Sequence, residues 1–162
     1  MTVLRPLIFC LTFLLVAPAF SQGTNVAFGT IRQDTSAPVE VTADNLSVDQ
    51  TTGKAVFEGN VVIGQGELRL SAQNVEVTYR SSSAGIANLV ATGGVTLVSG
   101  QDAAEAARAV YDIDSGTIVM TGSVLLTQGP SALTAESMTV DLKDGTARMS
   151  GRVKTILQTG GN

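Results

Sequence analysis

The sequence predicts an all-β fold, an open antiparallel β-jelly roll built from about four repeats of about 29 residues. The first observation is a Gly-x-Val phrase that begins at Gly59, Gly93, Gly122 and Gly151. The second is composition, since apolar residues make up 44% of the chain and aromatic residues only 4%; an interior of Val, Leu, Ile and Ala favours strands. The third is the alternation of apolar and polar residues from Val39 onward, which is typical of half-buried strands.

Residues 1–21 are expected to be a signal peptide that is removed. Arg5 precedes an uncharged apolar run from Leu7 to Phe20, and this run is shorter than the roughly 20 residues that a bilayer-crossing helix needs. Small residues at Ala17 and Ala19 offer a cleavage site. We therefore expect an exported protein, with a retained membrane anchor as the alternative.

The remaining residues are enough for one domain with its own core. Residues 22–37 mix Gly, Ser, Thr and Asn without a clear period, so we expect a flexible leader there. The domain is predicted over residues 38–157, and residues 158–162 are expected to form a disordered tail.

Each repeat is expected to begin with an alanine and an apolar residue three positions later, followed by a turn glycine and then the Gly-x-Val strand. The predicted starts are Ala43 with Leu46, Ala72 with Val75, Ala107 with Val110, and Ala135 with Met138, and the turn glycines are Gly53, Gly85, Gly116 and Gly145. Residues 102–110 have a helix-forming composition. Because they align with strand positions of the repeat, we predict a strand.

Repeats this short cannot bury their apolar faces alone, so they must stack and share a core. A β-solenoid and an antiparallel jelly roll both satisfy this requirement. The short turns at residues 112–116 and 143–145 join adjacent strands directly, and such turns favour antiparallel pairing. The jelly roll is therefore the preferred architecture.

The residue inventory argues against an enzyme. The chain has no histidine, and its single cysteine, Cys10, lies in the predicted signal peptide, so the common nucleophile and base pairings cannot be assembled. Acidic residues alternate with apolar ones, as solvated strand faces do, and no phosphate-binding loop is present. The basic residues are scattered, which argues against nucleic-acid binding. We predict no catalytic residues, no cofactor and no metal site.

Glycines inside strands mark bulges or bends, and four aligned bends would curve the sheet around a trough. The apolar residues on the concave side are then candidates for the lining of a groove. An alternative is that the same side chains fill a closed core. They are Phe57, Val61, Ile63, Leu68, Leu70, Leu97, Met120, Val124 and Leu126.

Three phrases resemble the OstA-like family of periplasmic lipopolysaccharide transport proteins, of the LptA type. They are the residues 38–44 (Pro-Val-Glu-Val-Thr-Ala-Asp), residues 59–66 with Gly-Asn-Val and Gln-Gly, and residues 68–72 with Leu-x-Leu-x-Ala. The resemblance extends over residues 38–157. It implies a long open β-jelly roll in the periplasm that bridges the inner-membrane extraction complex and the outer-membrane translocon by joining similar domains end to end.

The resemblance also implies a ligand and partners. By motif match we expect Val39, Val41 and Phe57, and with them Leu89 and Met120, to contact the acyl chains of lipopolysaccharide. Open sheet edges can join partners by strand addition. An LptC-like inner-membrane protein is expected at the N-terminal edge, an LptD-like outer-membrane protein at the C-terminal edge, and head-to-tail copies of the chain are possible. The expected edge residues are Val39, Val41, Leu46 and Val48 at one end, and Met149, Val153 and Ile156 at the other.

Two alternatives to a soluble lipid-carrying bridge stay open. One is an inner-membrane-anchored, LptC-like component of the same system, for which the fate of residues 1–21 is decisive. The other is a ligand-free exported β-solenoid that serves as a structural module, whose core would be closed.

Overall fold

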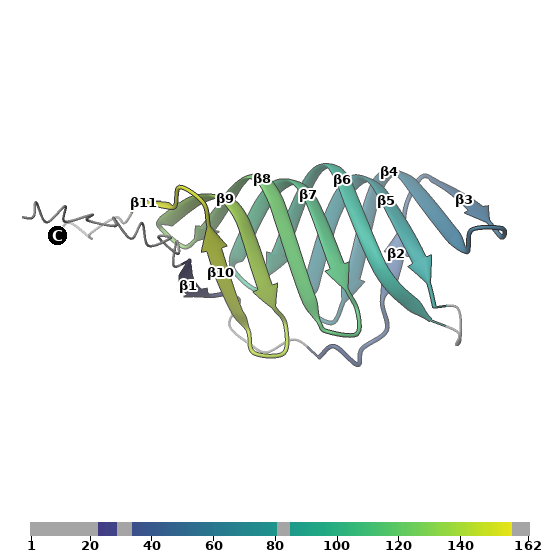
Figure 1. Cartoon of the computed structure of the whole chain (residues 1–162), viewed down its shortest axis with the longest axis horizontal. Coiled ribbons are helices and arrows are strands. Elements are labelled where there is room, and N and C mark those ends of the chain that lie inside the picture. The colour runs from purple at the N-terminus through teal and green to yellow at the C-terminus, as the bar shows by residue number, and fades with distance from the viewer. Residues whose placement is uncertain (1–22, 29–33, 81–84, 157–162) are drawn as a thin grey trace, which may run out of the picture.

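The computed structural model describes residues 23–28, 34–80 and 85–156. These residues form eleven β-strands and no helix (Figure 1). None of the described residues therefore forms a helix that could span a membrane. The strands are β1 Thr24–Ala27, β2 Glu40–Thr42, β3 Asn45–Asp49, β4 Lys54–Gln65, β5 Leu68–Tyr79, β6 Ile86–Ser99, β7 Asp102–Asp112, β8 Thr117–Gln128, β9 Ser131–Asp141, β10 Thr146–Ser150 and β11 Lys154–Ile156.

All eleven strands belong to one sheet in which neighbours are antiparallel. The order is β1-β10-β9-β8-β7-β6-β5-β4-β2, with β3 also paired to β4 and β11 also paired to β9. From β4 to β10 each strand pairs with the next along the chain, so the sheet is a series of hairpins. The predicted all-β, antiparallel jelly roll is confirmed, and the segment 102–110 is strand, as expected.

The long strands bend where the sequence repeats its strand glycine. In β4, Gly59 and Asn60 together oppose the single residue Gln73 of β5, which is a β-bulge. The bulge residues have positive φ, a conformation that suits glycine. Equivalent positive-φ pairs lie at Gly93-Gly94 in β6, at Gly122-Ser123 in β8, and at Gly151-Arg152 between β10 and β11.

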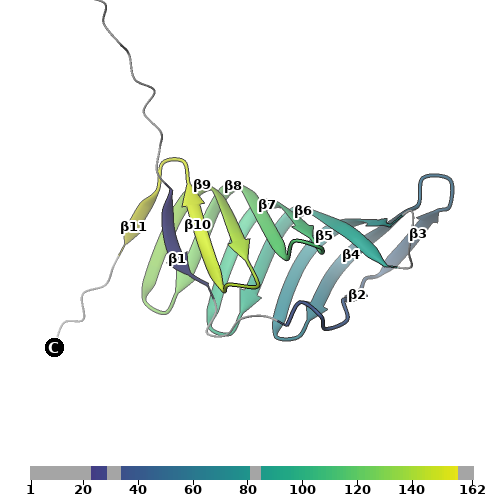
Figure 2. The same ribbon diagram turned by 60° about the horizontal axis from the view of Figure 1, so that its bottom comes forward.

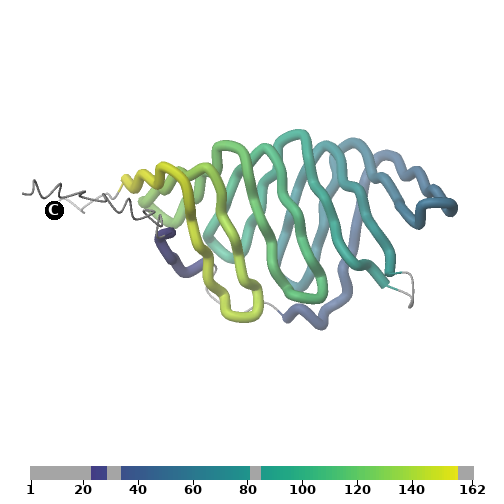
Figure 3. Tube along the Cα trace, in the orientation of Figure 1, coloured from purple at the N-terminus to yellow at the C-terminus, as the bar shows by residue number. Residues whose placement is uncertain are grey.

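These bends fold the sheet into two leaves, and the Cα trace passes back and forth between them (Figure 3). Leaf A contains β2, β11 and the halves of β4 to β9 that end at the turns 66–67, 100–101 and 129–130. Leaf B contains β1, β3, β10 and the other strand halves, with turns that include 113–116 and 142–145. We call the line along which the two rows of turns face each other the seam.

The core lies between the leaves and is made of aliphatic side chains and methionines, including Val75, Leu97, Met120 and Met138, all fully buried. At each bend two consecutive residues face outward, so inward residues are three apart: Ala72 and Val75, or Ala135 and Met138. In the third repeat the inward pair is Ala106 and Ala109. The predicted start at Ala107 and Val110 is wrong by one residue, because a run rich in alanine leaves the register unmarked.

The predicted flexible leader over residues 22–37 is wrong for its first part. Residues 24–27 form β1, which pairs with β10, and the Phe28 side chain is buried against the core. The edge of β10 offers a row of backbone hydrogen-bonding groups, and β1 satisfies them without any pattern in its own side chains. The predicted signal peptide, residues 1–21, and the predicted tail, residues 158–162, lie outside the described residues.

Candidate functional site

The predicted groove residues are brought together between the leaves, where most of them form a packed core. Three lie half-buried toward the β2 and β3 end, namely Val39, Val41 and Phe57. The other nine are buried, with at most 4% of their surface exposed. They are Val61, Ile63, Leu68, Leu70, Leu89, Leu97, Met120, Val124 and Leu126. The interior is therefore continuous and apolar, and it is closed along most of its length.

The apolar interior is uncovered at the β2 and β3 end. Leu46 and Val48 of β3 are 58% and 59% exposed. They pair with Phe57 and Ala55 of β4, whose side chains face the core, so both project from the inward face of the sheet. Since β2 and β3 are the last strands at this end, two large aliphatic side chains stand where a following strand would bury them.

The other end differs from the prediction. Met149 was expected on a free edge, but its side chain is fully buried, and its strand β10 is covered by β1 through the pair Met149 and Thr24. The outermost strands at this end of the sheet are β1 in leaf B and β11 in leaf A. Ile156 lies in β11 and is 54% exposed, while Val153 precedes β11 and packs against the core.

A buried polar contact crosses the seam. Gln65, at the end of β4 in leaf A, accepts a hydrogen bond from the Tyr111 hydroxyl, at the end of β7 in leaf B. Both side chains are buried. Burial raises the pKa of Tyr111 to about 12, a rise that its hydrogen bond to Gln65 reduces and the charge of Asp112 increases. The neutral phenol is thus the form that the seam accommodates.

Gln65 also holds the chain that precedes β2. Its amide Nε2 donates to the backbone carbonyl oxygens of Thr35 at 3.1 Å and Ala37 at 2.9 Å. On the leaf B side, a β-carbon added to Gly116 would lie 3.3 Å from Thr35 Cγ2. The segment 34–39 therefore lies across the seam and touches both rows of turns, as the views in Figures 1 and 2 show for its course toward β2.

A second glutamine makes the same kind of contact near the other end of the seam. Gln128, at the end of β8, donates from Nε2 to the Ala27 carbonyl oxygen at 2.7 Å and to Asp102 Oδ2 at 2.9 Å. The next residue, Phe28, donates its backbone N–H to the Gly145 carbonyl oxygen of a leaf B turn at 3.2 Å. Gln65 and Gln128 occupy the same position of the repeat, six residues after the bulge glycine. Neither glutamine is among the predicted site residues, although a polar residue repeated beside core positions was the available signal.

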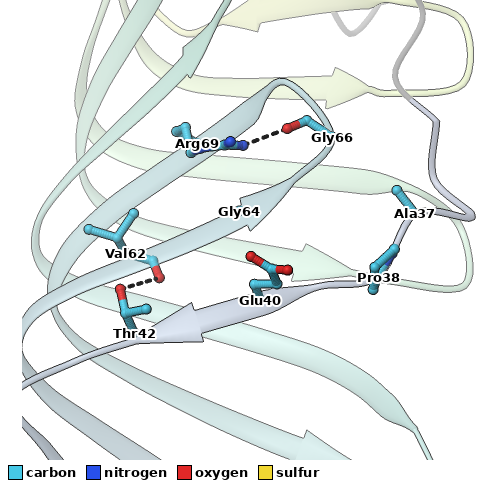
Figure 4. Close-up of a pocket in the computed structure, with 8 residues that line it drawn as sticks. All are labelled: Ala37, Pro38, Glu40, Thr42, Val62, Gly64, Gly66 and Arg69. Carbon is cyan, nitrogen blue, oxygen red and sulfur yellow. Dashed lines mark hydrogen bonds between the residues drawn. The ribbon is translucent and has the colours of Figure 1, made fainter.

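Two cavities lie beside this segment. One, of about 430 Å³, is lined on one side by residues 35–39 and on the other by Gln65, Arg80, Gly85, Ile86 and Ile113. The other, of about 510 Å³, opens on the outer surface of leaf A beside β2 (Figure 4). There Arg69 donates to the Gly66 carbonyl oxygen, and Thr42 donates weakly to the Val62 carbonyl oxygen. Glu40, Thr42 and Val62 project from the outer face, so this second cavity is separate from the interior.

The described residues contain no group of acidic residues spaced to hold a metal ion. Asp112 and Asp114, the closest approach to such a pair in the sequence, have structural partners instead. Asp112 accepts from the backbone N–H of Ser115 at 2.8 Å, and this bond lowers its pKa. Asp114 forms an ion pair with Arg80. Both belong to a turn, as the sequence predicts.

Comparison with known proteins gives consistent results. The model of the family described as LptA/(LptD N-terminal domain) LPS transport protein matches residues 40–146. An uncharacterized protein of Rhizobium meliloti (strain 1021) is 27% identical over 112 residues, which are 65% of this chain and 60% of that protein. The chain thus spans well under the full length of this relative.

Among solved structures, LptH of Pseudomonas aeruginosa has the same fold. It is described as the LptA-homologous periplasmic component of the conserved lipopolysaccharide transport device. The TM-score is 0.69 at 17% identity, and the match covers 78% of this chain and 99% of that chain. At this identity the match establishes the shared fold of the two proteins.

Proposed function

Because the chain belongs to the LptA/LptD N-terminal domain family of LPS transport proteins, we propose that it is a periplasmic bridge that carries lipopolysaccharide from the inner to the outer membrane. The observation that carries the proposal is the continuous apolar interior, which emerges uncovered at Leu46 and Val48. The protein acts by binding and passing on a lipid, without a chemical step.

The interior suits acyl chains because its lining is almost entirely aliphatic. Each methylene moved from water to an apolar surrounding gains about 0.8 kcal/mol, so a chain of about ten carbons gains roughly 8 kcal/mol. Besides the Tyr111 hydroxyl, the buried polar side chains among the described residues are Gln65 and Ser99, both at leaf A turns. Acyl chains therefore lie between the leaves, and the sugar and phosphate groups stay outside.

The two ends suit assembly by strand addition. The β2 and β3 end is the proposed site for an LptC-like partner, and β11 with β1 is the proposed site for an LptD-like partner. A second copy joined head to tail would place its β11 end against β3 and cover Leu46 and Val48. Two open sheet ends of this kind support a bridge built from several domains.

Site-specific photo-crosslinking in cells tests the proposal. A photoreactive amino acid at Phe57 or Val41, on the inward face, is expected to capture lipopolysaccharide. The control position is Val119, which is 37% exposed on the outer face of β8 and is expected to capture none. Equal labelling at Phe57 and Val119, or none at Phe57 and Val41 in folded protein, would refute lipid carriage between the leaves.

A further inference from the structure

We propose that residues 34–39 act as an internal seal on the seam, which must be released for an acyl chain to enter between the leaves. This inference rests on the proposed function and identifies where the lipid enters. It follows from three observations: the packed interior, the different construction of the two long sides of the sheet, and the contacts that hold residues 34–39 in place.

The packed interior requires an opening movement. Leu97, Met120 and Leu126 are fully buried and belong to one continuous cluster. Protein interiors are packed about as densely as organic crystals, so an acyl chain can enter only if the leaves move apart. The volume that the chain takes up must be created by that movement.

The movement is confined to the seam. On the bend side every long strand passes covalently from one leaf to the other, and the bulges there, such as Gly59-Asn60, can serve as hinges. On the seam side, two side-chain hydrogen bonds join the leaves among the described residues: one from Tyr111 to Gln65, and one from Gln128 to the Ala27 carbonyl oxygen of β1. Separation of the two rows of turns therefore breaks few contacts, whereas separation at the bends would break strands.

Residues 34–39 occupy the gap that this separation would widen. Gln65 of leaf A binds the carbonyl oxygens of Thr35 and Ala37, and Thr35 packs beside Gly116 of leaf B. The segment is itself a closed turn, because Ala37 N–H donates to the Asp34 carbonyl oxygen at 3.1 Å and Ser36 N–H to Asp34 Oδ1 at 2.9 Å. A compact turn is thus bound between the rows through its backbone.

The contacts that hold the segment are suited to release. Its hydrogen bonds to the sheet come from one glutamine side chain to main-chain carbonyl groups, which water can replace once the segment moves out. Its apolar contacts include Thr35 beside Gly116 and the half-buried Val39. The cavity of about 430 Å³ between this segment and Ile86 and Ile113 also gives an incoming chain its first apolar contact at the seam. Binding of the acyl chain and release of the segment are coupled, since both need the same space.

A reversible disulfide tests this coupling. The chain after residue 21 has no cysteine, so the double variant Thr35→Cys/Gly116→Cys contains a single possible cross-link between the segment and leaf B. Binding of fluorescently labelled lipopolysaccharide is measured for the oxidised protein and again after reduction. The two single variants, oxidised and reduced in the same way, are the controls for the substitutions themselves.

The oxidised protein is expected to bind at least about tenfold more slowly or more weakly than the reduced protein, a coupling of ordinary size. Equal binding by the two forms would overturn the seal and leave the proposed function intact. If neither form binds, and a crosslinker at Phe57 also captures no lipid, the proposed function fails and the seal with it.

A second pair of variants tests the seal without a new cross-link. Gln65→Leu/Tyr111→Phe removes both buried polar partners together and frees residues 35–37, whereas Tyr111→Phe alone keeps the bonds from Gln65 to Thr35 and Ala37. The double variant is expected to bind labelled lipopolysaccharide at least about threefold faster than Tyr111→Phe. Equal rates for the two variants would overturn the proposal.

Discussion

The Tyr111 hydroxyl donates a hydrogen bond to Gln65 Oε1, and this bond joins the ends of β7 and β4 across the seam. The two residues are 46 positions apart in the chain and belong to different leaves. A buried polar pair of this kind links several segments, because Gln65 accepts from Tyr111 through its amide oxygen and donates to Thr35 and Ala37 through its amide nitrogen. The pair fixes the position of the segment before β2.

Alkaline pH is expected to weaken the fold through Tyr111. Its pKa is about 12 in the folded chain and about 10 when unfolded, so below pH 10 both states keep the proton. Between about pH 10 and about pH 12 the unfolded state loses it first, and the free energy of unfolding falls by up to about 1.4 kcal/mol per pH unit.

Urea unfolding of the wild type, Tyr111→Phe and Tyr79→Phe across this range checks the assignment. Tyr79 is 44% exposed and serves as the matched control. The difference in unfolding free energy between wild type and Tyr111→Phe should shrink as the pH rises, while Tyr79→Phe should follow the wild type. A constant difference for Tyr111→Phe would contradict a buried, neutral phenol.

The bulge glycines can be tested in pairs. Gly94 and Gly122 both have positive φ, of 84° and 88°, so alanine strains either backbone by about 1–2 kcal/mol. Only at Gly122 would the new β-carbon also meet a neighbour, Ala107 Cβ, at 2.7 Å. Gly122→Ala should therefore lower the free energy of unfolding by a further ~1–3 kcal/mol.

Urea denaturation of the two variants separates backbone strain from close approach of the strands. The strain is common to both, so the difference between them reports the contact with Ala107 alone. Equal losses of stability would mean that the strands at the bend can move apart freely.

The sequence predicts the fold well because its strongest signals are local. The positions of the bends follow from glycines that must take positive φ, and the strand pairing follows from short turns. The inward residues Val61, Ile63, Val124 and Leu126 could be placed on one face by alternation alone. The register of the third repeat could not, because alanines at positions 103, 104, 106, 107 and 109 give either face the same apolar character.

Features that depend on distant segments could not be read from the sequence. β1 is too short and too polar to be marked by its own residues, and it is a strand because β10 offers it an edge. Because the pairing of β1 with β10 cannot be recognised in the sequence, Met149 was predicted to lie on a free edge strand. The role of Gln65 depends on Tyr111 and on residues 35–37, whose proximity is set by the folding of the two leaves.

Substitution inside the interior distinguishes a packed core from an open groove. Leu97→Ala is expected to lower the free energy of unfolding by about 2–5 kcal/mol, because Leu97 is fully buried and its removal leaves a cavity. Val119→Ala, on the outer face of β8, should cost less than about 1 kcal/mol. Urea denaturation of both variants gives the comparison. Similar small losses would indicate that the lining at Leu97 already faces solvent.

The β3 end provides the test of assembly. Leu46 is 58% exposed on an inward-facing position of the last strand of leaf B at this end, so Leu46→Asp should change the free energy of unfolding by less than about 0.5 kcal/mol. In an end-to-end assembly the same side chain is covered by the next domain. A carboxylate buried there without a partner is strongly unfavourable, so association should weaken by at least about tenfold.

Sedimentation of the purified protein over a range of concentrations measures this association. Val119→Asp places the same charge on the outer face of β8, far from either end of the sheet, and should associate like the wild type. Loss of association in both variants would point to a general effect of charge. Unchanged association in Leu46→Asp would show that the exposed aliphatic residues of β3 are not the surface through which domains join.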